Sequence, residues 1–179
     1  MALTYFLNRN ICKLAGQLTK VRLGAFDGLN SLLVFINSND NEAQRRYQWL
    51  KTQFPYINLL IVIQFTQEKK LDYIVHNGIL KISRHSFTLF GKPVAALQNM
   101  IKNQHFELLI NADETSSLYL HALAATAETK LKIGASSKQC NALYPLSIYS
   151  QAAVSFEDYM MQCRSYLNAL AGVSAAKTN

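Results

Sequence analysis

Short apolar runs alternate with longer amphipathic stretches along most of this chain of 179 residues. The apolar runs span residues 31–37, 57–64, 106–111, 130–134 and 146–149. Nearly continuous runs such as Leu-Leu-Val-Phe-Ile within 31–37 are typical of parallel strands that are buried on both faces. The spacing of apolar residues in the other stretches predicts helices over 41–54, 94–103, 118–128 and 155–170.

Residues 106–134 form one strand–helix–strand unit, a βαβ crossover, which requires a parallel sheet. We therefore expect an α/β fold, a three-layer Rossmann-like domain with a mostly parallel sheet of five or six strands. The sheet core should contain Leu33, Val34, Phe35, Leu60, Ile61, Val62, Leu108, Leu109, Ile110 and Ile133. Residues 71–75 and 79–83 also have the composition of strands, with Asn77-Gly78 as a turn between them, which predicts a β-hairpin.

Residues 1–26 predict an amphipathic helix that precedes the domain. Basic residues, among them Arg9, Lys13 and Lys20, fall opposite an apolar face. Its own sheet, a partner protein or a membrane surface must cover that face, and we expect the first of these. Residues 27–171 then form a single α/β domain, and the small, polar residues 172–179 form a frayed tail.

Composition limits the class of protein further. Half of the residues are hydrophobic and 16% are charged, as in globular chains. Cys12, Cys140 and Cys163 are too widely spaced to indicate a disulfide framework or a zinc site, which favours a reducing compartment. The sequence shows no signal peptide, and its longest apolar run is too short to span a bilayer. We expect a cytoplasmic protein without a transmembrane segment.

The chain is basic, with 18 basic and 11 acidic residues and a formal charge of +7. No acidic residue precedes Asp27, and none lies between Asp72 and Glu107. Such a surface favours anionic partners such as RNA, or a protein complex. The expected contacts are Arg9, Lys13, Lys20, Arg22, Lys81, Arg84 and Lys92. The alternative is a modest basic bias without a partner.

Two aromatic residues, Phe87 and Phe90, lie within the basic tract that runs from Lys81 to Lys92. Basic and aromatic residues together can bind single-stranded nucleic acid by charge and stacking. The alternative buries both rings and leaves the charges to protect an edge strand. Burial is the commoner fate of aromatic residues.

Motifs that name a reaction, a cofactor or a metal are absent from the sequence. It has no Gly-rich phosphate loop and no G-x-S-x-G elbow, and its four histidines share no metal-ligand spacing. We therefore expect no cofactor, no metal and no catalytic residue, which favours a protein that is not an enzyme.

The best candidate for a ligand site follows from the expected topology. In open α/β sheets, ligands bind beyond the carboxyl ends of the strands at the point where the strand order reverses. With the order 3-2-1-4-5, this point lies between strands 31–37 and 106–111. The two loops that leave these strands carry the polar residues Ser38, Asn39, Asn111, Asp113, Thr115 and Ser116. The alternative role of these residues is simple N-capping, and the nearby acidic residues count against a phosphate ligand.

Three segments resemble a known family, namely Phe90-Gly91-Lys92-Pro93, residues 106–111 and residues 118–134. They are similar to short bacterial α/β proteins that are catalogued only as a domain of unknown function, which implies the fold but no activity. More remotely, F-E-L-L-I-N, the Ala-rich helix and K-L-K-I-G resemble the acceptor-side Rossmann half of heptosyltransferase-like glycosyltransferases. Those enzymes bind their sugar nucleotide mainly in a second domain, for which this chain has no room.

The sequence therefore favours a non-enzymatic, cytoplasmic interaction module whose basic surface contacts RNA or a protein complex, with a membrane surface ranked behind these partners. The alternative is a protein that binds a nucleotide or a sugar phosphate, or a glycosyltransferase-like enzyme, with its site at the two switch-point loops. The two hypotheses differ in their response to salt, because binding to a phosphate backbone weakens steeply as salt is added.

Overall fold

The structure is a computed structural model. It describes residues 26–69, 71, 73–113, 115, 117–135, 143–148 and 154–176, except the side chains of 135 and 172–176. Except for Phe26, the predicted N-terminal helix lies outside the described residues. The same is true of Ser116 and of the basic residues Arg9, Lys13, Lys20 and Arg22.

Six strands form one sheet in the order β3-β2-β1-β4-β5-β6, and each neighbouring pair runs parallel. The strands are β1 (Ser31–Asn37), β2 (Leu59–Phe65), β3 (Ile79–Ile82), β4 (Phe106–Asn111), β5 (Thr129–Ala135) and β6 (Leu146–Ile148). At the centre, Val34 of β1 lies opposite Val62 of β2 and Ile110 of β4. The predicted fold class and strand order are confirmed.

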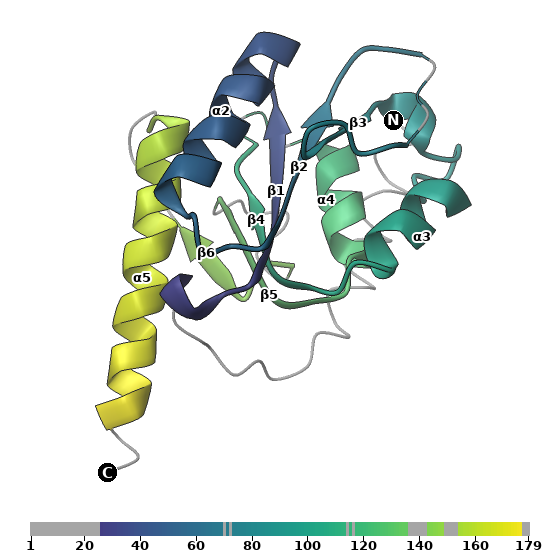
Figure 1. Ribbon diagram of the computed structural model, residues 1–179. Helices are drawn as coiled ribbons and strands as arrows, with labels where there is room; N and C mark the ends of the chain where they lie inside the picture. Colours follow the sequence, from purple (N-terminus) through teal and green to yellow (C-terminus); the bar gives the residue numbers. More distant parts are fainter. Residues whose placement is uncertain are drawn as a thin grey trace.

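Helices cover both faces of the sheet (Figure 1). They are α2 (Asp40–Gln53), α3 (Ala95–Lys102), α4 (Leu118–Thr126) and α5 (Phe156–Ala176), with short 3-10 turns η1 (Phe26–Gly28) and η2 (Arg84–Ser86). One half of the core joins the sheet to α2 and α5, and the other joins it to α3 and α4. Side chains alternate between the two halves, so that Leu33 faces α3 and α4 whereas Val34 faces α2 and α5. All ten predicted core residues are buried.

The predicted hairpin is wrong in one of its two strands. Asn77 and Gly78 form the expected tight turn with φ values of 49° and 77°, and His76 pairs with Ile79 across it. The described residues of that segment, 71 and 73–75, however, form no strand, and β3 lies parallel to β2. The reason is burial, because Tyr73 and Val75 pack against the core under α3 and α4 and cannot also pair along the outer edge of β3.

The C-terminal helix is longer than predicted, because α5 continues to Ala176 where we placed its end at residue 170. Ala has the highest helix propensity, and a single Gly costs only about 1 kcal/mol, so the segment after Leu170 sustains the helix. The middle of α5 is tied to the beginning of the domain. Asn168 accepts a hydrogen bond from the backbone N–H of Phe26 at 2.8 Å, and Arg164 pairs with Asp27 at 2.9 Å.

Candidate functional site

The two switch-point loops lie side by side at the carboxyl ends of β1 and β4. Asn37 Nδ2 donates a hydrogen bond to Thr115 Oγ1 at 2.8 Å and so joins the loops directly. This contact follows from the parallel pairing of β1 with β4, which brings the ends of both strands to one edge of the sheet. The topology therefore brings together the loops that the sequence singled out.

Most polar groups of these loops are satisfied within the loops themselves. Asn39 caps α2, because its side chain accepts the N–H of Glu42 at 2.9 Å. Asp113 accepts hydrogen bonds from the N–H groups of Thr115 and Ser117 at 2.9 and 2.6 Å. The Ser38 hydroxyl is buried without a partner among the described residues. For Asn39 and Asp113, capping and loop closure account for the residue type.

A buried polar network lies behind the β4 loop. The Tyr144 hydroxyl is 2.7 Å from Asn111 Nδ2 and 2.7 Å from His121 Nδ1. The Tyr144 ring lies so close to Gly134 of β5 that a Cβ there would be 2.7 Å from it. Burial lowers the pKa of His121, and the Asp113 carboxylate opposes this shift. The network anchors the loop from inside the core, and Asn111 is therefore only 2% exposed.

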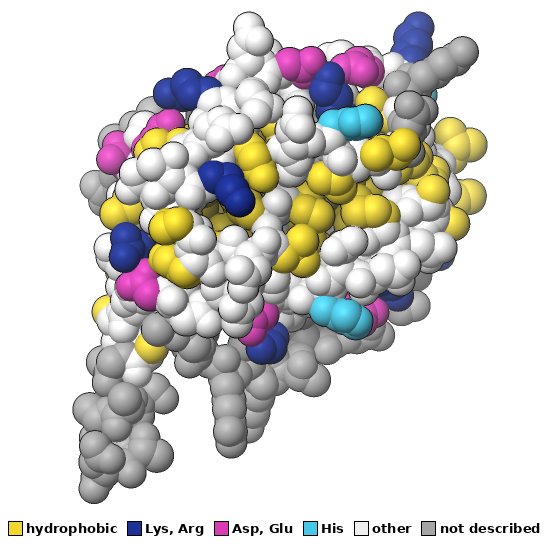
Figure 2. All heavy atoms as spheres, viewed as in Figure 1, with side chains coloured by type: hydrophobic (Ala, Val, Ile, Leu, Met, Phe, Trp, Pro, Cys, Tyr) yellow, Lys and Arg dark blue, Asp and Glu magenta, His cyan; other side chains and the backbone are white. Residues whose placement is uncertain are grey.

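The three basic residues of the tract that were expected to contact an anionic partner differ in their surroundings. Lys81 pairs with two carboxylates, Asp40 at 2.6 Å and Glu68 at 2.9 Å. Arg84 and Lys92 are exposed. Figure 2 shows Lys and Arg side chains scattered among Asp and Glu side chains on one face of the molecule.

The two aromatic residues of the tract have different environments. Phe87 is buried and its ring lies 5.0 Å from that of Tyr119, as expected if the ring belongs to the core. Phe90 is 59% exposed, so the expectation that both rings are buried is correct for Phe87 alone.

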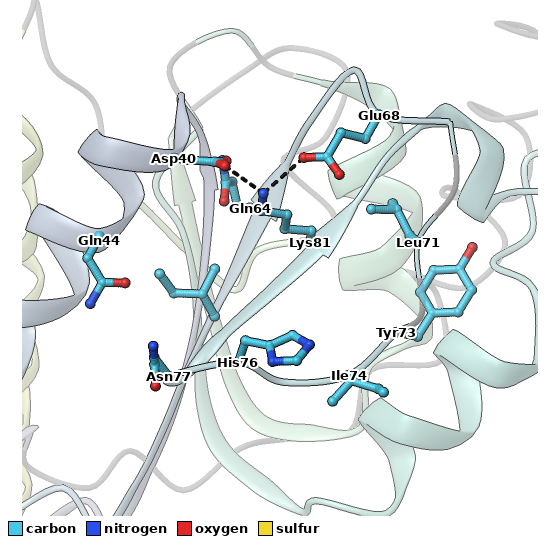
Figure 3. A pocket seen from close by; sticks show the side chains of 11 residues that line it. Asp40, Gln44, Gln64, Glu68, Leu71, Tyr73, Ile74, His76, Asn77 and Lys81 are labelled. Atoms are coloured by element: carbon cyan, nitrogen blue, oxygen red, sulfur yellow. Dashed lines mark hydrogen bonds and ion pairs between the residues drawn. The ribbon is translucent and has the colours of Figure 1, made fainter.

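A pocket of about 470 Å³ lies at the outer edge of the sheet, beside β3 (Figure 3). We call it the β3-edge pocket. Its walls come from the first turns of α2, from the ends of β2 and β3, and from the segment between these strands. Parallel strands are usually joined through a helix. The described residues of the connection from β2 to β3, which spans 66–78, form no helix, and the edge of β3 is left open.

Charged residues lie at one end of this pocket, where Lys81 bridges Asp40 and Glu68. The hydrogen bond from Lys81 holds the pKa of Asp40 below its ordinary value, helped by Gln64, whose amide donates to Asp40 Oδ1 at 2.8 Å. The two carboxylates in turn raise the pKa of Lys81. The Asp40 carboxylate and the Lys81 ammonium therefore stay ionised near neutral pH.

Polar and apolar side chains without a carboxylate or an ammonium group line the rest of the β3-edge pocket. Gln44, Tyr73, His76 and Asn77 form no side-chain hydrogen bond with the described residues. Leu71, Ile74 and Ile79 supply apolar walls. The turn that carries His76 and Asn77 is fixed on α2, because the Tyr47 ring lies directly over Gly78.

Sequence reasoning missed this pocket. Its polar residues are spread from Asp40 to Lys81 over several elements and form no motif. One usable signal was Gln64, a polar residue at the end of an apolar strand that is 1% exposed. The other was the Asn77-Gly78 turn after a segment without a helical pattern.

Within the described part of the chain, no group of three or more His, Cys, Asp and Glu residues could hold a metal ion. The helices described here include none that is long and apolar enough to cross a membrane. Cys163, on α5, is a buried free cysteine.

Comparison with known proteins gives a family but no function. No curated protein and no solved structure matches the chain. The remote similarity to glycosyltransferases therefore stays a prediction. A single family model matches residues 4–170, which is nearly the whole length, and the chain thus belongs to DUF6913, a family of unknown function.

Proposed function

We propose that this protein binds a small molecule in the β3-edge pocket. The observation that carries the proposal is the set of hydrogen-bonding side chains without partners, Gln44, Tyr73, His76 and Asn77, around one cavity. Ligand sites typically measure about 300–1,000 Å³ and combine apolar walls with a few polar groups, and this pocket has both properties. The part of the pocket that holds Gln64 and Lys81 lies near the carboxyl ends of β2 and β3, the side of the sheet on which open α/β folds bind ligands.

The switch-point loops support ligand binding less well than this pocket. Asn39, Asp113 and Thr115 use their polar atoms for contacts within and between the loops. A ligand there would have to break those hydrogen bonds, each worth about 1 kcal/mol. We therefore move the proposed site outward, from the boundary between β1 and β4 to the β3 edge of the sheet.

Binding of RNA or of a protein complex through a basic surface stays a prediction. Of the 18 basic and 11 acidic residues, 11 and 9 lie among the described residues, so most of the excess positive charge belongs to the rest of the chain. If RNA binds, charge reversal at Arg84 and Lys92 should weaken binding, and affinity should fall steeply with added salt. A cytoplasmic location is likewise an expectation from the sequence.

A thermal-shift screen against a library of small metabolites tests the proposed function. A ligand at about 100 times its Kd stabilises the folded state by about 2.7 kcal/mol, which raises the Tm of a protein of this size by roughly 5–10 °C. We expect Gln44→Ala to lose this shift, because Gln44 lines the pocket.

Gln48→Ala is the matched control for this screen. Gln48 lies one turn further along α2 and is exposed outside the pocket. It should keep the full shift. A library in which no compound stabilises the protein, or in which the shift survives Gln44→Ala, would contradict the proposal.

A further inference from the structure

We infer that the ligand of the β3-edge pocket is an uncharged molecule with adjacent hydroxyl groups. This inference rests on the small-molecule binding proposed above and names the chemical class of the ligand. It comes from the arrangement of charges at one end of the pocket, from the kind of polar groups left without partners, and from the apolar walls.

The charged residues disfavour ligands of either sign. Lys81 Nζ lies 2.6 Å from Asp40 Oδ2 and 2.9 Å from Glu68 Oε1, so one ammonium stands between two carboxylates. A phosphate or carboxylate ligand would meet both acidic groups, and the cation that could attract it is already engaged. An ammonium ligand would be attracted by the same carboxylates but repelled by the ammonium group of Lys81, which lies between them. Repulsion between like charges a few Å apart therefore acts on a charged ligand of either sign.

The unpartnered polar groups match hydroxyl groups. A hydroxyl both donates and accepts, and two adjacent hydroxyls present such a pair side by side. The carboxamides of Gln44 and Asn77 also both donate and accept, as does the phenol of Tyr73. A ligand with acceptors alone, such as a phosphate, would leave the carbonyl oxygens of Gln44 and Asn77 unpaired.

The apolar walls match the carbon skeleton of such a ligand. Ile79 lines the pocket and is buried, and Leu71 and Ile74 line it beside Tyr73 (Figure 3). Tyr73 adds an aromatic ring and has a φ of 50°, the left-handed region that bulky residues rarely adopt. Backbone strain of this kind is concentrated at ligand-binding and active sites. Asn77 has a similar φ, but Asn tolerates the left-handed region in turns. The strained backbone of Tyr73 therefore holds its ring at the pocket.

Titration monitored by protein NMR, with three sets of compounds, tests the inference. The neutral set is glucose, ribose and myo-inositol, the anionic set is glucose 6-phosphate and ribose 5-phosphate, and the cationic compound is glucosamine. We expect at least one neutral compound to shift the backbone amide signals of Gln44, His76 and Asn77. Its charged counterpart should bind roughly tenfold more weakly, a difference of about 1.4 kcal/mol. Gln44→Ala should abolish the shifts and Gln48→Ala should keep them.

Glu68→Gln tests the charge argument separately. Removing one carboxylate should reduce the difference in affinity between glucose and glucose 6-phosphate several-fold. The inference is overturned if no neutral compound binds at high millimolar concentration, or if a charged counterpart binds as tightly. A charged metabolite that stabilises the protein through Gln44 would overturn the inference and leave the proposed function intact. The proposed function itself fails only if no compound of any class depends on Gln44.

Discussion

Single residues constrain this protein most where the backbone leaves no room for another atom. Gly78 combines a φ of 77° with a Tyr47 ring that would lie 2.1 Å from an added Cβ. Gly78→Ala therefore adds left-handed strain of about 1 kcal/mol to overpacking of about 1–3 kcal/mol. We expect a loss of stability of about 2–4 kcal/mol in urea unfolding, together with loss of ligand binding, because the turn shapes the pocket.

Gly28→Ala provides the control for this substitution. No atom lies within 4 Å of an added Cβ at Gly28. Its effect should stay within about 0.5 kcal/mol. Equal losses in both variants would show that the Tyr47 contact is not the cause.

Lys132 is a charged residue in an apolar setting. It is 3% exposed on β5, and burial lowers its pKa to about 8, a shift that Glu128 opposes. The unfolded chain, with an ordinary pKa of about 10.4, binds more protons than the folded chain between these two values. Stability should therefore rise with pH from about 8 to about 10.4, by up to about 1.4 kcal/mol per unit.

Lys132→Met should remove that rise and should be more stable than the wild type at pH 7, as measured by urea unfolding at a series of pH values. Lys130→Met is the matched control on the same strand, because Lys130 is exposed and pairs with Glu107 at 2.6 Å. The control should keep the alkaline rise. If the stability of the wild type did not change between pH 8 and about 10.4, the assigned burial of the Lys132 ammonium group would be contradicted.

Helices and strands could be predicted from the sequence where the pattern of buried residues alone determines them. The central strands were predictable because runs such as residues 31–37 are apolar on both faces. The absence of a strand among the described residues of 71–75 was not predictable from the sequence. Their composition suits a strand, and only the core contacts of Tyr73 and Val75 decide against it. The end of α5 was also missed, because a terminal Ala-rich segment carries no stop signal except Gly172.

The start of α2 offers a test at the scale of one element. Asn39→Ala removes the side chain that accepts the Glu42 N–H, and it should cost about 1 kcal/mol in stability. Asn39→Ser should restore most of that loss, since Ser is also a good cap. Asn41→Ala, an exposed position in the first turn of α2, should change unfolding by less than about 0.5 kcal/mol. Equal effects at both positions would rule out capping as the role of Asn39.

At the scale of the whole molecule, topology was easier to predict than the site. The strand order and the meeting of the loops after β1 and β4 follow from the rules for parallel sheets. The β3-edge pocket depends on where an irregular connection packs, and such a segment has no periodicity to interpret. The ion pairs of Lys81 were equally hidden, since Asp40 lies 41 residues away in the sequence.

The strand order also divides the molecule into two sequence-contiguous halves. β3, β2 and β1 all precede α3, whereas β4, β5 and β6 all follow it, and β1 pairs with β4 to join the halves in the sheet. The exposed residues between α3 and β4 are thus a natural place to divide the chain. Fragments 1–104 and 105–179 should each aggregate alone, since each exposes a central strand edge, yet assemble into one soluble heterodimer when co-expressed. The protein would then serve as a split reporter for the proximity of two fused partners.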